Sequence, residues 1–241
     1  MEKKQLTTNL KIFGIVLLVM VGLWIIKYGS RPFLADIYFK KGLKAGEKGD
    51  FLTAIEEIKR AAYLQPREPI YHQSLGAWYL EAAIVESDRD RQERLFNQAT
   101  AGYQVYLNLL PQDARGYDGL GSAYVQMGRY LDKKYFRTAI DCFRKAVELD
   151  PHLIGAVNNL GAVYALLDLK EEAIAIYQKA IKENPGNADL YFNLGFVYFR
   201  SGDMKKAGYY WEKTLEVDPE HVDAKRGLAL LKKEVRNEIE Y

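Results

Sequence analysis

The sequence predicts an all-α protein made of stacked helical hairpins. A Leu-Gly pair followed three residues later by tyrosine occurs four times along the chain. These copies are Leu75-Gly76 with Tyr79, Leu120-Gly121 with Tyr124, Leu160-Gly161 with Tyr164, and Leu194-Gly195 with Tyr198. Gly161 and Gly195 are 34 residues apart, and no segment shows the apolar-polar alternation of a strand. A fixed period of this length is typical of a solenoid, in which each unit buries its apolar face against its neighbours.

The chain begins with an apolar segment. Residues 12–26 contain no charged side chain, and Lys11 and Lys27 flank them. A helix over about 10–28 is long enough to cross a bilayer if both lysines reach toward the headgroups. Trp24 and Tyr28 suit a membrane interface. We therefore expect residues 1–34 to form a tail, a transmembrane helix and a short linker.

Two questions about this segment stay open. Lys3 and Lys4 ahead of an apolar core also fit a cleaved secretory signal, although Lys27-Tyr28-Gly29 offers no small-residue cleavage site. The orientation depends on weighing lysines on both sides of the span, and large domains translocate largely regardless of charge. We expect a single-pass protein of a bacterial inner membrane, with the repeats on the periplasmic side.

The second half of each hairpin is as regular as the first. Small residues recur on the second helices at Ala54, Ala99, Ala139, Ala173 and Ala207. The large residues that fill the space between helices are Tyr103, Phe143, Tyr177 and Trp211. A proline follows each second helix. Proline has no amide hydrogen to donate and biases the preceding residue away from helix, so the helix is expected to end before it. These positions resemble the tetratricopeptide repeat (TPR) family from Leu34 onward.

The resemblance implies a right-handed superhelical solenoid of five helix-turn-helix repeats over 35–221. With the glycine at the eighth position, the repeats run 35–68, 69–113, 114–153, 154–187 and 188–221. Repeat two carries about 11 extra residues around 86–97, and repeat three about 6 around 131–136. We expect the second helix of each repeat to approach the first helix closely at the glycine of the eighth position. These glycines are Gly42, Gly76, Gly121, Gly161 and Gly195.

The last segment, 222–241, is predicted to be a capping helix. Leu228, Leu231, Val235 and Ile239 recur at spacings of three and four residues and form one apolar stripe. The other face mixes lysine and arginine with glutamate, which argues against a basic membrane- or nucleic-acid-binding helix. A solenoid needs such a helix to cover its last repeat.

Composition excludes several classes of function. The chain has a net charge of +2, but residues 1–34 hold five basic residues and one acidic residue, which leaves −2 for the rest. A near-neutral solenoid offers no electrostatic footprint for nucleic acid. The three histidines lie in different repeats, the single Cys142 adjoins a packing residue, and no nucleophile elbow or phosphate loop is present. We expect no enzyme activity, no cofactor and no metal site.

The resemblance implies a binding groove lined by first helices. The expected groove residues are Asn158, Asn159, Ala162, Asp189, Phe192, Asn193, Phe196, Phe199 and Arg200. Asn159 and Asn193 occupy equal positions one repeat apart, where carboxamides can bind the backbone of an extended peptide or make contacts within the protein. The three phenylalanines share one helical stripe, which either forms an exposed patch for a partner or is covered by the terminal helix.

We therefore expect a membrane-anchored scaffold that binds a protein or peptide partner in its groove and assists assembly of an envelope or membrane protein complex. Two alternatives remain. The first is a purely architectural protein that associates with itself as a homo-oligomer. The second is a secreted, soluble TPR module released by signal cleavage.

Overall fold

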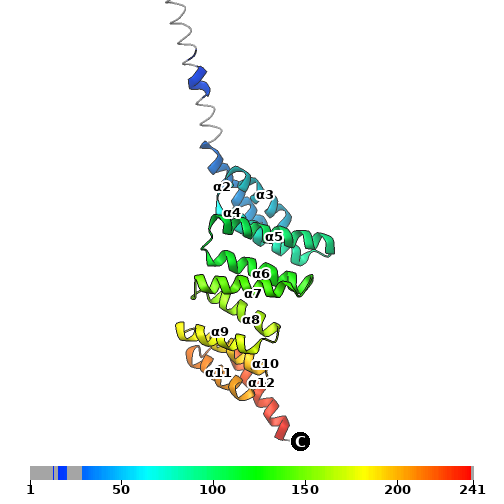
Figure 1. Ribbon diagram of the computed structural model, residues 1–241, viewed down its shortest axis with the longest axis vertical. Helices are drawn as coiled ribbons and strands as arrows, with labels where there is room; N and C mark the ends of the chain where they lie inside the picture. Colours follow the sequence, from blue (N-terminus) through cyan, green and yellow to red (C-terminus); the bar gives the residue numbers. More distant parts are fainter. Residues whose placement is uncertain (1–12, 14–15, 21–28, 240–241) are drawn as a thin grey trace, which may run out of the picture.

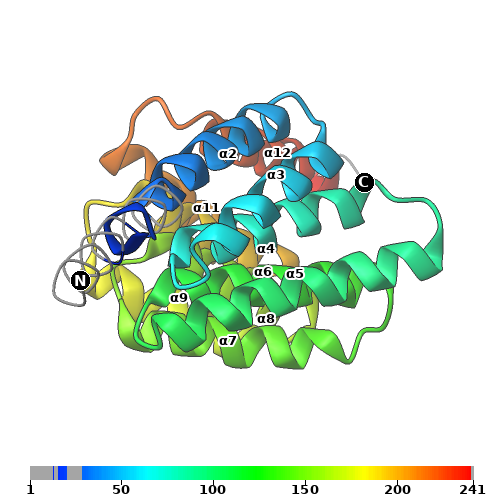
Figure 2. The same cartoon turned by 90° about the horizontal axis from the view of Figure 1, so that it is seen from above.

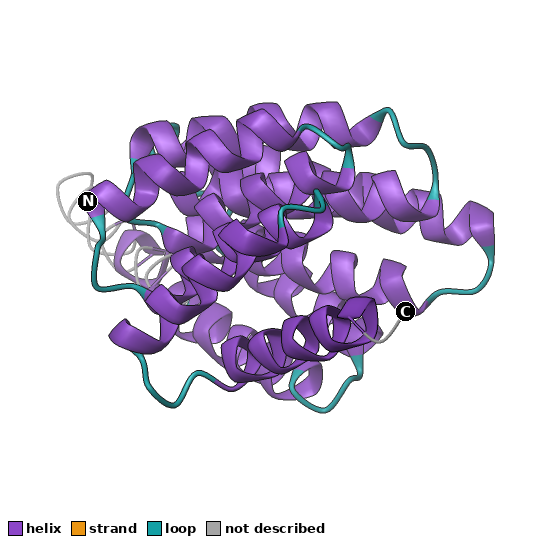
Figure 3. Cartoon of the chain, turned by 90° about the horizontal axis from the view of Figure 1, so that it is seen from below, coloured by secondary structure: helices purple, strands orange, loops and turns teal. Residues whose placement is uncertain are grey.

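The computed structural model describes residues 13, 16–20 and 29–239, and every regular element in this part of the chain is a helix (Figure 3). The helices are α2 (Arg31–Gly46), α3 (Phe51–Leu64), α4 (Pro69–Val85), α5 (Arg89–Leu109), α6 (Ala114–Tyr130), α7 (Tyr135–Leu149), α8 (Ile154–Leu166), α9 (Lys170–Glu183), α10 (Ala188–Arg200), α11 (Met204–Val217) and α12 (Val222–Ile239).

The helices stack as a linear array of hairpins (Figure 1). Each even-numbered helix from α2 to α10 packs on the odd-numbered helix that follows it, and the even-numbered helices of adjacent hairpins also contact each other from α4 to α10. Seen along the stack, the hairpins lie over one another (Figure 2). The prediction of an all-α, TPR-like helical repeat array is confirmed.

Local sequence explains where the helices begin and end. The side chains of Asp50, Asp88, Asp113, Asn187 and Asp203 each accept a hydrogen bond from a backbone N–H in the first turn of the following helix. These are N-caps, which satisfy donors that have no partner inside the helix. The second helices end two residues before the prolines at 66, 111, 151, 185 and 219.

The glycines of the first helices make room for one large side chain from the second helix. A Cβ atom at Gly121 would lie 2.6 Å from Cε1 of Phe143, and one at Gly195 would lie 2.6 Å from Cδ1 of Trp211. Such distances are shorter than any real carbon contact, so only glycine fits without displacing the ring. Gly76 and Gly161 meet Tyr103 and Tyr177 in the same way. At these four positions the neighbour that the glycine accommodates is therefore mainly an aromatic side chain, whereas Gly42 meets Ile58.

The extra residues of repeats two and three lengthen helices. The helices α4 and α5 contain 17 and 21 residues, and α6 contains 17. By contrast, α8 and α10 contain 13 residues each. The long hairpin of α4 and α5 projects from the side of the stack (Figure 2). The lengthened α6 matters for the site, because it adds a turn beyond the length of α8 and α10.

The helix α12 packs on α11 at the end of the stack. Ala224 and Leu231 are buried, Leu228 packs against the core, and Gly227 lies over the ring of Trp211. This arrangement agrees with a terminal cap for the part of the apolar stripe that the structure describes. The side chains of Val235 and Ile239 lie outside that part.

The predicted transmembrane helix over 10–28 falls mostly outside the described residues. Residues 13 and 16–20 of this segment are helical. Within the described part of the chain, no helix combines the length and apolar character needed to cross a membrane. The first helix of the array, α2, begins at Arg31, four residues before the predicted start of repeat one.

Candidate functional site

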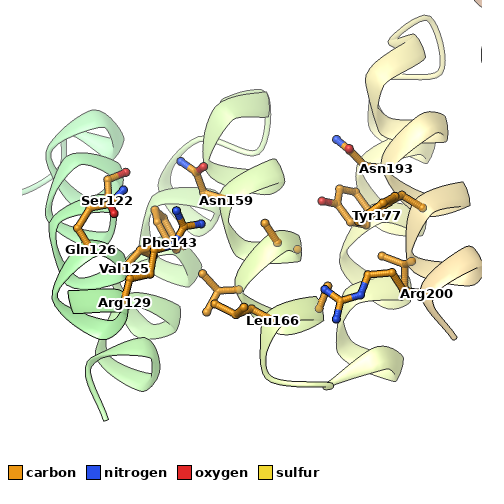
Figure 4. A pocket seen from close by; sticks show the side chains of 16 residues that line it. Ser122, Val125, Gln126, Arg129, Phe143, Asn159, Leu166, Tyr177, Asn193 and Arg200 are labelled. Carbon is orange, nitrogen blue, oxygen red and sulfur yellow. The ribbon is translucent and has the colours of Figure 1, made fainter. Parts of the chain in front are cut away.

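A pocket of about 410 Å³ lies between the first helices α6, α8 and α10 (Figure 4). Its walls come from three successive hairpins, and the side chains of Phe143 and Tyr177 from α7 and α9 form part of its floor. The lining residues are Ser122, Val125, Gln126, Arg129, Phe143, Asn159, Gly161, Ala162, Val163, Ala165, Leu166, Tyr177, Asn193, Phe196, Val197 and Arg200. We call this cavity the groove pocket.

Part of the groove pocket is apolar and open to solvent. Leu166 is 46% exposed and Phe196 is 44% exposed, although both side chains are large and apolar. Ala162 is also exposed and lies one helical turn before Leu166 on α8. Apolar surface gathered in a concavity and left uncovered is typical of a site that a partner covers.

The two predicted asparagines lie at one end of the groove pocket (Figure 4). The side-chain amide of Asn159 donates a hydrogen bond to Oδ1 of Asp118, 2.9 Å away on α6. The amide of Asn193 donates to Oδ1 of Asn158, also at 2.9 Å. Both amides therefore join neighbouring first helices, so part of their hydrogen-bonding capacity is used inside the protein.

Asp118 fixes which way Asn159 points. An ionised carboxylate only accepts hydrogen bonds, so Asn159 must turn its amide nitrogen toward Asp118. The carbonyl oxygen of Asn159 makes none of the side-chain hydrogen bonds found among the described residues and remains an acceptor for a ligand N–H group. Burial raises the pKa of Asp118, while the hydrogen bond from Asn159 acts in the opposite direction.

Two arginines lie at the other end of the groove pocket, Arg129 at the end of α6 and Arg200 at the end of α10. In Figure 4 they stand on either side of the pocket with Leu166 between them. Neither forms an ion pair with a described residue, whereas Arg60, Arg115 and Arg226 each do. The groove pocket thus has acceptors at one end, cations at the other, and exposed apolar surface on Leu166 and Phe196.

The predicted aromatic stripe does not act as one surface. Phe192 stacks on Trp211 with 6.2 Å between ring centroids, and Phe199 packs on the same indole at 5.5 Å. Phe192 also contacts the ring of His221, whose Nε2 lies 3.2 Å from Asp189 Oδ1. Because Trp211 draws these two phenylalanines into the core of the last hairpin, only Phe196 of the three lines the groove pocket.

Of the nine predicted groove residues, five line the groove pocket, namely Asn159, Ala162, Asn193, Phe196 and Arg200. Asn158 supports the site from behind, while Asp189, Phe192 and Phe199 lie apart from it at the last hairpin. Arg129 and Val125 were not among the expected residues. The insertion in repeat three was the sequence feature that could have indicated Arg129. It lengthens α6, and the additional turn of α6 lies beside the pocket.

The described residues show no catalytic or metal centre. No group of three or more His, Cys, Asp and Glu side chains among them is arranged to hold a metal ion. The histidines bind at separate turns: His72 to the carbonyl of Pro66, His152 to Asn184 and His221 to Asp189. Burial raises the pKa of the Cys142 thiol to about 11, which leaves little reactive thiolate at neutral pH.

Comparison with protein-family models identifies the repeats. A TPR repeat model matches residues 171–202, and two tetratricopeptide repeat models match residues 188–221 and 114–153. The human protein named Superkiller complex protein 3 is 36% identical over 81 residues, and its mouse counterpart is 37% identical over the same length. The match covers 34% of this chain but only 5% of either of those proteins.

Solved structures with the same architecture cover most of the chain. A crystal structure of MamA is 27% identical with a TM-score of 0.60, over 81% of this chain and 96% of that one. TTC0263, a thermophilic TPR protein of Thermus thermophilus, is 21% identical with a TM-score of 0.58, over 82% and 98%. YrrB, described as a TPR protein with an unusual peptide-binding site, is 18% identical with a TM-score of 0.54, over 78% and 89%. The recurring motifs, the helical array and these matches together show that the chain is a tetratricopeptide repeat protein.

Proposed function

We propose that this protein is a membrane-anchored adaptor that holds a segment of a partner polypeptide in the groove pocket and so assists assembly of an envelope or membrane protein complex. The observation that carries the proposal is the exposed apolar surface of the pocket, formed by Leu166 and Phe196, in a cavity that also holds asparagine and arginine side chains. In this proposal the five repeats of 35–221 form a right-handed superhelix with the groove pocket on its concave side.

A polypeptide segment suits the chemistry of the groove pocket. Apolar surface accepts a side chain, while carboxamide and guanidinium groups at the ends bind backbone or charged groups. The TPR fold is a scaffold that typically carries no catalytic site, and it suggests protein or peptide partners. The description of YrrB as a peptide-binding TPR protein supports the same class of ligand for this chain.

The membrane part of the proposal is supported by the sequence. The uncharged stretch of residues 12–26, bracketed by Lys11 and Lys27, has the character of a span. We propose a single-pass anchor in a bacterial inner membrane, with the repeats in the periplasm. Carbonate extraction tests the anchor: the full chain should stay with the membrane pellet. Protease added to spheroplasts should digest the repeats, and digestion only after membrane lysis would contradict the orientation.

The binding proposal is tested by changing Phe196 to aspartate. A charge placed on the exposed ring position should abolish capture of a crosslinked partner from a detergent extract of membranes, because the apolar contact becomes a desolvated carboxylate. Tyr209→Asp is the matched control, since Tyr209 is 53% exposed and lies on α11 outside the groove pocket. If Phe196→Asp keeps its helical circular dichroism and still captures the same partner, the groove pocket is not the binding site.

A specific observation favours one alternative function, which is self-association of the first hairpin. Leu52 and Tyr63 of α3 are exposed apolar residues far from the groove pocket. A surface of this kind can join two copies of a solenoid end to end. Sedimentation of the detergent-solubilised chain tests it: a concentration-dependent dimer that Leu52→Glu dissociates would favour an architectural role.

A further inference from the structure

The groove pocket carries a net positive charge on its lining. Of the sixteen residues that line it, Arg129 and Arg200 are charged and none is acidic. Asp118 lies behind Asn159 at the opposite end of the pocket, where its carboxylate accepts the amide hydrogen bond. Asp168 and Lys170 line a small adjoining pocket with Arg200, so one carboxylate and one ammonium group offset each other there.

The two guanidinium groups are free to bind a ligand. Within the part of the chain that the structure describes, no carboxylate lies within ion-pair distance of Arg129 or Arg200, and both side chains are exposed. A guanidinium group presents planar paired donors that match a carboxylate, and it binds it more strongly when a neighbouring apolar contact excludes water. Leu166 and Phe196 supply that apolar contact beside both arginines.

The opposite end of the groove pocket offers hydrogen-bond acceptors to a ligand. The amide nitrogens of Asn159 and Asn193 already donate to Asp118 and Asn158. The carbonyl oxygens of the two asparagines make no side-chain hydrogen bond among the described residues, so a peptide backbone N–H group can bind them, and each amide keeps one further N–H group. Acceptors at one end and cations at the other give the site a direction.

Resting on the proposed function, we infer that the ligand of the groove pocket is a peptide segment that carries an acidic side chain next to an apolar one. The apolar side chain lies on Leu166 and Phe196, the carboxylate is attracted to the positive charge of Arg129 and Arg200 on the two sides of the pocket, and backbone N–H groups bind the asparagine carbonyls. The charge on the arginines thus selects the partner, while the apolar contact holds it.

Selection from a bacteriophage library of short random peptides tests this inference on the full chain in detergent. Peptides captured by the wild-type protein should be enriched in Asp or Glu beside Leu, Ile, Val or Phe. The double variant Arg129→Glu with Arg200→Glu should lose this enrichment and instead select Lys or Arg. The matched control is Arg137→Glu, which reverses an exposed charge on α7 away from the groove pocket and should select the same peptides as wild type.

A selected peptide, synthesised with an amidated C-terminus, gives the quantitative test. Replacing its glutamate by glutamine should weaken binding about tenfold or more, since a hydrogen-bonded charge pair shielded from water contributes about that much. Arg129→Gln and Arg200→Gln should each weaken binding similarly and make it less sensitive to salt. A requirement for a free C-terminal carboxylate instead of the acidic side chain would overturn the inference.

The possible failures are distinguishable. Peptides that depend on Phe196 but show no preference for acidic residues would overturn the inference and leave the proposed function standing. If no peptide is enriched on wild type relative to the folded Phe196→Asp variant, the groove pocket binds no peptide, and the proposed function fails together with the inference. Circular dichroism of each variant confirms that the helical array is intact.

Discussion

The amide of Asn159 donates a hydrogen bond to the carboxylate of Asp118 at 2.9 Å, and this bond joins α8 to α6 across 41 residues of sequence. It links two adjacent repeats at the edge of the groove pocket. Because Asp118 accepts and cannot donate when ionised, the bond also decides which polar atom of Asn159 meets a ligand. One half-buried carboxylate thereby orients a polar side chain of the site.

Changing Asp118 to alanine should weaken binding of a groove-pocket peptide roughly threefold to tenfold, which corresponds to about one hydrogen bond. Without Asp118 the carboxamide of Asn159 is free to turn and offers the ligand a mixture of donor and acceptor. Asp118→Asn should bind almost as wild type, because its side-chain oxygen still accepts from Asn159. Calorimetric titration distinguishes the two variants, and equal losses in both would refute the orienting role.

The same pair predicts a pH effect. Burial raises the pKa of Asp118, so the carboxyl group of Asp118 binds a proton more tightly in the folded protein than in the unfolded chain. The contribution of Asp118 to the free energy of unfolding should therefore grow as the pH falls from neutral through its folded pKa, and Asp118→Asn should remove that growth. Urea unfolding at a series of pH values measures it.

The 34-residue period and the recurring pattern of small and large residues were enough to predict the helical array. The glycine and the aromatic residue of each hairpin recur because one must accommodate the other, as Gly121 does for Phe143. That requirement is local to a hairpin, so a repeating sequence reveals it without knowledge of the rest of the fold. The extra residues of repeat three were also visible in the sequence, but the sequence analysis did not predict that they lengthen α6.

The groove residues were predicted less well, because exposure depends on neighbours that a position number does not specify. Phe192, Phe196 and Phe199 share a face of α10, yet Trp211 holds the first and last, which are partly buried, in aromatic contacts. A smaller residue at 211 would leave all three uncovered. The sequence also could not show that Asp118 and Asn158 already bind the two asparagine amides.

The contact between glycine and aromatic ring predicts a large effect of one methyl group. Gly121→Ala should lower the free energy of unfolding by roughly 1–3 kcal/mol, because the ring of Phe143 must move. Gly155→Ala is the matched control: a Cβ atom there meets no atom within 4 Å. That variant should be neutral or stabilised by up to about 1 kcal/mol through helix propensity. Urea denaturation compares them, and equal effects would contradict the steric account.

Asp113 predicts a loss of stability in acid. Its carboxylate accepts hydrogen bonds from the side chain of Arg115 and from the hydroxyl of Tyr106, and these bonds lower its pKa from 3.8 to about 2. A lowered pKa means that the stabilisation is complete above about pH 4 and disappears as the pH falls through 2. Asp113→Asn keeps a helix N-cap but removes the charge. It should cost roughly 1 kcal/mol at pH 7, allowing for solvent screening.

The comparison that isolates the charge is between pH 7 and pH 2. The free energies of unfolding of wild type and Asp113→Asn should differ at pH 7 and approach each other as the pH falls through 2, because the carboxyl group then becomes protonated in the folded state as well as in the unfolded state. Arg115→Gln, which removes the largest cause of the lowered pKa, should behave in the same direction. A difference that stays constant over this range would show that the effect of the substitution is steric and not electrostatic.

The contacts of Trp211 predict that a substitution at this residue should unfold the last hairpin first. Its indole lies against Gly195 and Gly227, stacks with Phe192 and Phe199, and donates from Nε1 to the carbonyl of Phe192 at 3.2 Å. Trp211→Ala therefore removes the contact that unites α10, α11 and α12, at a cost of about 3–5 kcal/mol. In a stack where each repeat touches only its neighbours, such a loss at one end remains local. Hydrogen exchange should accelerate in α10 to α12 while α2 to α5 keep their protection. Uniform acceleration along the chain would mean that the repeats unfold as one unit, because a local loss would then destabilise every hairpin equally.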